Sequence, residues 1–87
     1  MRFRSFPTES QTQLNTLLLK LMQGRHFTVG TALNELGIYA LSQRIGELKR
    51  LGWPIESRRL AKGVKLYKLE IGDYRYEIQH LKSSGRS

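Results

Sequence analysis

Apolar residues in the first part of the chain recur at the spacing of an amphipathic helix. Four leucines before Gly24 stand at i, i+3, i+4 and i+7, namely Leu14, Leu17, Leu18 and Leu21. Thr8 and Ser10 each precede a glutamine by three residues, which is the spacing of a capping box, and Gly24 offers a stop. The pattern predicts a first helix with one face in the core.

Two shorter apolar patterns follow, and each is closed by a glycine. Thr28 can cap a helix of about two turns that ends at Gly37, with an apolar face of Val29, Ala32, Leu33 and Leu36. After a brief link, Gly37-Ile38, a third helix ends at Gly52 before Pro54, with Leu41, Ile45 and Leu48 on one face. Three short helices are therefore predicted before residue 53.

Beyond Trp53 the pattern changes to approximate alternation. Residues 55–59 and 64–69 are short runs on either side of Gly63, which predicts a β-hairpin. Two pairs compete for the buried face of the second run, Val64 with Leu66 and Tyr67 with Leu69, so the register stays open. Trp53 itself is expected to fill the core between the third helix and the hairpin.

The segment DYRYEIQHLK, residues 73–82, favours a further helix, although its YRYEI also alternates like a strand. This segment has four apolar or aromatic residues, Tyr74, Tyr76, Ile78 and Leu81. They either complete the core of the monomer or form a homodimer contact. We therefore divide the chain into a flexible basic N-terminal arm (1–9), a main domain (10–72), this C-terminal element (73–82) and a flexible tail (83–87).

Composition and charge narrow the class of partner. The chain has 87 residues, no cysteine and a formal net charge of +8, which suits one small basic domain without disulfides or thiolate metal sites. Most of the excess is local, because two anions, Glu47 and Glu56, accompany eight cations: Arg44, Lys49, Arg50, Arg58, Arg59, Lys62, Lys65 and Lys68. A localised basic patch is the usual electrostatic footprint of nucleic-acid binding.

The order of the elements favours a winged helix-turn-helix. Two short helices joined by a glycine link, with a first helix to pack on, form the helix-turn-helix, and a basic hairpin after them forms a wing. The predicted fold class is thus mainly α with a small β-hairpin (α+β), three helices plus wing.

Two stretches also carry a family resemblance. Residues 32–60, ALNELGIYALSQRIGELKRLGWPIESRRL, resemble the small helix-turn-helix domains common in phage and prophage genomes, whose pattern is roughly ALxxxGxxxLxxRIxxLRxxGxxI. RIGELKRLGWPIES followed by KGVKLY is similar to the winged helix-turn-helix of the biotin-repressor type, in which a helix ending in glycine leads into a wing bearing Lys-Gly. Both resemblances imply DNA binding, and neither supplies a target site.

The third helix has an outward stripe opposite its apolar face, at i, i+4, i+7 and i+11: Tyr39, Gln43, Gly46 and Arg50. Glutamine suits adenine and arginine suits guanine in the major groove, and the tyrosine could stack or touch a thymine methyl. A glycine in mid-helix costs about 1 kcal/mol relative to alanine. Either Gly46 admits DNA closely or a neighbouring element packs tightly against it.

Phosphate contact is expected from the residues beside this stripe and from the wing. On the helix these are Ser42, Arg44 and Lys49. An ion pair with Glu35 or Glu47 is the alternative for Arg44. On the wing they are Arg58, Arg59, Lys62, Gly63 and Lys65, which would meet the backbone or the minor groove.

Catalysis is not expected, since the two histidines and seven acids show neither metal-ligand spacing nor an acid/base pair. We expect no cofactor, no small-molecule ligand and no membrane span. The sequence predicts a cytoplasmic DNA-binding protein of bacterial or phage origin, in the manner of a small transcriptional regulator. The alternatives are an excisionase-like architectural factor, an RNA-binding domain and a protein-interaction module.

Overall fold

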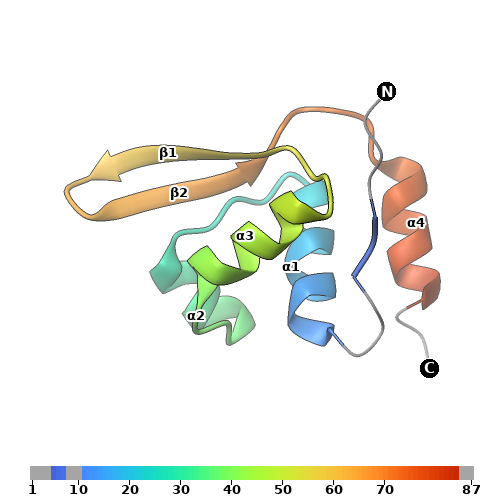
Figure 1. Ribbon diagram of the computed structural model, residues 1–87, viewed down its shortest axis with the longest axis horizontal. Helices are drawn as coiled ribbons and strands as arrows, with labels where there is room; N and C mark the ends of the chain where they lie inside the picture. Colours follow the sequence, from blue (N-terminus) through green and yellow to red (C-terminus); the bar gives the residue numbers. More distant parts are fainter. Residues whose placement is uncertain (1–4, 8–10, 85–87) are drawn as a thin grey trace.

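The computed structural model of the chain describes residues 5–7 and 11–84, and it has an α+β fold. Its elements in chain order are α1 (Thr12–Met22), α2 (Val29–Leu36), α3 (Leu41–Arg50), β1 (Ile55–Ala61), β2 (Val64–Leu69) and α4 (Arg75–Ser84) (Figure 1). The helix preferred for residues 73–82 is confirmed, so the described chain has four helices rather than three. None of these helices is long and apolar enough to cross a bilayer.

Helix α1 lies at the centre of the molecule and contacts the other three helices and β2. The predicted leucine stripe is buried, with Leu17 and Leu18 fully inaccessible to solvent. Gln11 occupies the N-cap position, whereas the predicted capping residues Thr8 and Ser10 lie outside the described residues. Gly24, with φ of 90°, ends the turn after the helix as expected.

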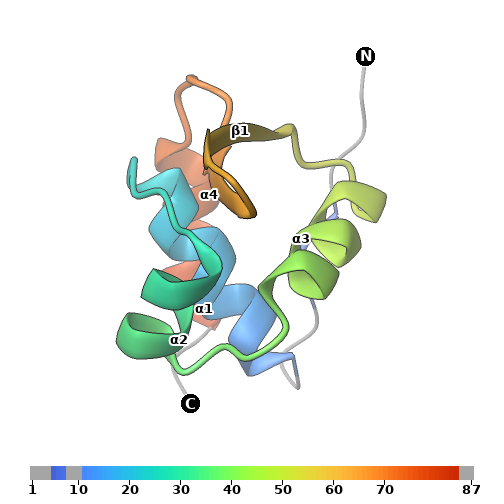
Figure 2. The ribbon, with the colours of Figure 1, turned by 90° about the vertical axis from the view of Figure 1, so that its left-hand side faces the viewer.

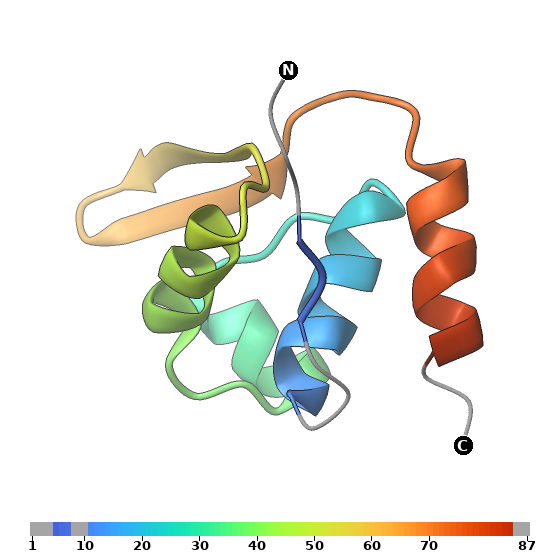
Figure 3. The same cartoon turned by 45° about the vertical axis from the view of Figure 1, so that its right-hand side comes forward.

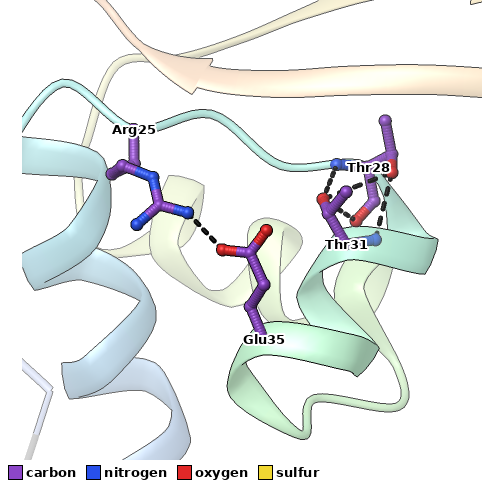
Figure 4. A network of polar contacts seen from close by, with 4 residues as sticks. All are labelled: Arg25, Thr28, Thr31 and Glu35. Carbon is purple, nitrogen blue, oxygen red and sulfur yellow. Dashed lines mark hydrogen bonds and ion pairs between the residues drawn. The ribbon is translucent and has the colours of Figure 1, made fainter.

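Helix α2 begins at a capping box. The Thr28 hydroxyl accepts a hydrogen bond from the Thr31 amide at 3.2 Å, and the Thr31 hydroxyl accepts one from the Thr28 amide at 2.8 Å (Figure 4). An ion pair between Arg25 and Glu35 ties the α1–α2 linker to the last turn of the helix. At the other end Gly37 is left-handed, with φ of 69°.

The predicted apolar face of α2 is only partly correct. Ala32 is fully buried and Leu36 is half-buried, but Val29 is 49% exposed and Leu33 is 39% exposed. The helix has eight residues and packs on the core along the line of Ala32, so its flanking apolar side chains remain in contact with water.

The link between α2 and α3 is longer than the predicted Gly37-Ile38. It covers residues 37–40, because α3 begins at Leu41 with Ala40 as its N-cap. Ile38 is fully buried, so the link packs into the core before α3 begins. Leu41, Ile45 and Leu48 are buried as predicted.

The hairpin has its predicted turn at Gly63, where φ is 77°. Tyr67 and Leu69 occupy the buried face of β2, which decides the open register against Val64. The sequence did not reveal a further strand-like contact: the amide and carbonyl groups of Phe27 bond the carbonyl and amide of Tyr67, at 2.9 and 2.8 Å. This bridge fixes the hairpin to the linker between α1 and α2.

Residues 5–7 do not belong to a flexible arm, which corrects the prediction for 1–9 over this stretch. The Ser5 amide donates to the Leu51 carbonyl at 2.8 Å, and its carbonyl accepts from the buried Trp53 indole at 2.7 Å. The Phe6 ring lies 5.3 Å from that of Trp53 and 4.2 Å from that of His80 on α4. The segment therefore lies between the end of α3 and α4 (Figure 3).

Helix α4 completes the core of the monomer. Tyr74 and Leu81 are buried in that core and Ile78 is half-buried, whereas Tyr76 is 85% exposed.

The start and the end of α4 also differ from a simple capped helix over 73–82. Asp73 accepts a hydrogen bond from the Arg75 amide at 3.1 Å, and its bonds from the Arg75 side chain lower the pKa of its carboxyl group. Helix α4 ends at Ser84, so the first two residues of the flexible tail predicted for 83–87 belong to the helix instead. Residues 85–87 lie outside the described chain.

Candidate nucleic-acid interface

The outer face of α3 is polar and open to solvent. Burial of its three apolar residues turns Gln43 and Arg50 outward, and both are exposed. Figure 2 shows α3 on one side of the molecule, with α2 and α4 on the other side and the hairpin above. Both side chains carry donors that can reach base edges in a major groove.

Gly46 lies between these two residues and is partly exposed. Apart from its two chain neighbours and the backbone of its own helix, a β-carbon built on it would meet no described atom within 4 Å. A tightly packed neighbouring element is therefore contradicted as the reason for this glycine. The other explanation considered from the sequence, close approach of DNA, stays a prediction.

Tyr39 does not share the helical stripe predicted for it. It lies in the link before α3, so the spacing of four residues to Gln43 is not a helical one. Its side chain is 80% exposed and is free of the core. The stripe on the helix thus consists of Gln43, Gly46 and Arg50, with an exposed tyrosine ahead of its first turn.

The three predicted phosphate-contact residues on α3 have different surroundings. Arg44 is half-buried and its Nη1 pairs with Glu47 Oε1 at 2.6 Å, which is one of the two partners considered for it. Ser42 is exposed, and its hydroxyl lies 3.2 Å from the Tyr67 hydroxyl of β2. Lys49 is exposed and has no ion pair with any described acid. Of these three residues, Lys49 is thus the one most available to contact a phosphate.

The register of the hairpin separates its cations onto two faces. Arg58 pairs with Leu66, and Glu56 pairs with Lys68, so these four side chains share the outer face. Arg59 lies directly opposite Lys65, on the face that carries Tyr67. Leu60 is the extra residue of a bulge between Arg59 and Ala61. Lys62 and Gly63 form the exposed turn.

An open groove of about 210 Å³ lies between the inner face of the hairpin and the starts of α2 and α3. Residues from all of these elements line it: Val29, Ser42, Arg59, Gly63, Val64, Lys65 and Tyr67. Four of them were predicted from the sequence as contacts to the DNA backbone, namely Ser42, Arg59, Gly63 and Lys65. No signal in the sequence pointed to Val29 and Val64, whose exposure depends on how the hairpin crosses α2.

Ion pairing leaves most of the local positive charge unneutralised. Arg44 pairs with Glu47, and Lys68 lies 3.8 Å from Glu56. Among the described residues the other six of the eight cations have no acidic partner: Lys49, Arg50, Arg58, Arg59, Lys62 and Lys65. These six residues all lie on α3 or the hairpin, and we call them the basic surface.

No group of three histidine, aspartate or glutamate residues within the described chain could hold a metal ion. Comparisons of the chain with protein-family models, curated proteins and solved structures gave no match.

Proposed function

We propose that the chain is a winged helix-turn-helix protein that binds duplex DNA, with α2 and α3 as the helix-turn-helix and β1–β2 as the wing. The basic surface is the single observation that carries the proposal. Among the described residues, six cations without acidic partners lie on α3 and the hairpin, and the exposed face of α3 carries Gln43 and Arg50 and has open space beside Gly46. Unneutralised charge of this kind attracts phosphates, and a helix fits the major groove.

In this proposal α3 enters the major groove. Gln43 bonds an adenine and Arg50 bonds a guanine through two hydrogen bonds, whereas Lys49 and the wing hold phosphates. The protein acts by occupying its site in the cytoplasm of a bacterium, as a small transcriptional regulator of bacterial or phage origin. An excisionase-like role uses the same contacts and differs in whether the bound DNA is bent.

Fluorescence anisotropy with a labelled duplex of about 24 base pairs, between about 50 and 200 mM salt, tests the proposal. Counting Lys49, Arg58, Lys62 and the facing pair of Arg59 and Lys65 as four phosphate contacts, at about 0.9 each, gives a slope of about −3.6 in log affinity against log salt, so this fourfold rise in salt lowers affinity about 150-fold. Single-stranded DNA and duplex RNA of the same length are compared in parallel.

A matched pair of variants controls for net charge. Lys49→Ala removes a charge from the basic surface and is expected to reduce the slope by about one unit. Lys82→Ala removes an equal charge from an exposed position on α4, outside the basic surface, and we expect the slope to stay the same. Preference for a single strand would favour the RNA-binding alternative, and duplex binding that is indifferent to salt would contradict the proposal.

A further inference from the structure

The inner face of the hairpin tip carries an unusual pair of charges. Arg59 and Lys65 lie directly opposite each other on antiparallel strands, where β-carbons are about 5 Å apart. Like charges in this position destabilise a hairpin, and neither residue has an acidic partner in the described chain. An anion placed between them would remove this repulsion.

The groove beside this pair offers further donors. The hydroxyl groups of Ser42 and Tyr67 lie 3.2 Å apart on its wall, and either can donate to the other. Whichever hydroxyl accepts in that pair keeps its own proton for a ligand. Two cations and a hydroxyl proton from three elements therefore converge on one open groove.

The rim of the groove is apolar. Val29 at the start of α2 and Val64 at the start of β2 are 49% and 40% exposed, and both line it. A phosphodiester has charged oxygens between two sugars that carry C–H groups. Its charge matches Arg59 and Lys65, and its sugars match the two valines.

The outer face of the same hairpin offers no such arrangement. Arg58 lies directly opposite the apolar Leu66 on that face, where Glu56 and Lys68 lie 3.8 Å apart, so no second cation faces it across the strands. The adjacent arginines thus differ in surroundings, although they are alike in type and exposure.

We propose that the groove between the hairpin and the starts of α2 and α3 binds one backbone phosphodiester of duplex DNA. Arg59 and Lys65 hold its two charged oxygens, and the Ser42–Tyr67 hydroxyl pair supplies one more hydrogen bond. This inference rests on the proposed function. Because the groove adjoins the first turn of α3, the bound phosphate fixes where that helix enters the major groove.

The test compares two double variants by their salt slopes on the duplex used above. Arg59→Ala/Lys65→Ala empties the groove of charge and is expected to reduce the slope by about 0.9, the value for one phosphate. Lys20→Ala/Lys82→Ala removes the same charge from α1 and α4, outside the basic surface, and is expected to leave the slope unchanged. Thermal unfolding of each variant verifies that the fold persists.

The outcomes separate the two proposals. If the wild-type protein binds no duplex, the proposed function fails and the phosphate site fails with it. If it binds and both double variants change the slope equally, DNA binding stands and the groove has no special role. A decrease of about 1.8 for Arg59→Ala/Lys65→Ala would mean two separate phosphates, which overturns the shared site.

Discussion

Replacing Gly46 with alanine separates the needs of the fold from the needs of binding. A mid-helix glycine costs about 1 kcal/mol relative to alanine, because it loses more backbone freedom on folding. Beyond its chain neighbours and the backbone of its own helix, the added methyl group meets no described atom within 4 Å, so no clash with another element offsets this gain. For a domain of this size, about 1 kcal/mol raises the melting temperature by about 4–8 °C.

The effect on binding is expected to have the opposite sign. If α3 approaches DNA closely at Gly46, a methyl group there holds the helix away from the base edges. Loss of one good base contact costs about 1–3 kcal/mol, which is about a 5- to 150-fold loss of affinity. Gly46→Ala is therefore expected to be more stable and to bind more weakly.

Circular dichroism on heating and fluorescence anisotropy with duplex DNA measure the two effects. Gly30→Ala is the control, because its added carbon meets only the Thr28 hydroxyl at 3.9 Å and lies on α2 rather than α3. We expect Gly30→Ala to leave affinity unchanged. A Gly46→Ala protein that is more stable and binds DNA as well as the wild type would refute close approach at this residue.

Three further substitutions test separate parts of the structure. Arg50→Ala is expected to relax base preference at one position of the bound site and to cost about 1–3 kcal/mol there; an unchanged preference, measured by competition with single-base variants, would remove it from base contact. Phe6→Ala is expected to lower the unfolding free energy by about 2 kcal/mol in urea titrations, since it removes the ring packed on Trp53 and His80; a loss below about 0.5 kcal/mol would mean that the N-terminal segment is not docked. Gly37→Ala forces a side chain into the left-handed conformation at φ of 69° and is expected to cost about 1 kcal/mol in the same assay; equal stability would contradict that cap.

Helices and the hairpin could be predicted because their signals are local. Thr28, Gly37 and Gly63 each act on the backbone within a few residues, and the leucines of α1 report their own buried face. The charge of the hairpin was likewise visible in composition. The division of these cations between the two faces of the hairpin could not be predicted, because the register was open. The register decides which of Arg58 and Arg59 faces α2 and α3.

The features that the sequence missed depend on contacts between distant residues. Phe27 meets Tyr67 across the fold, and Ser5 meets Trp53 across a separation of 48 residues. Neither contact has a local pattern that would reveal it. The burial of Ile38, which starts α3 at Leu41 and places Tyr39 in the link, is also decided by tertiary packing.

Selection of binding sites from random duplex DNA, at one fixed salt concentration, tests directly whether α3 recognises bases. We expect an enriched motif in which an adenine and a guanine are required, with the requirement for guanine lost in Arg50→Ala and that for adenine lost in Gln43→Ala. No enrichment over the starting pool, or enrichment that neither substitution alters, would contradict base recognition by α3.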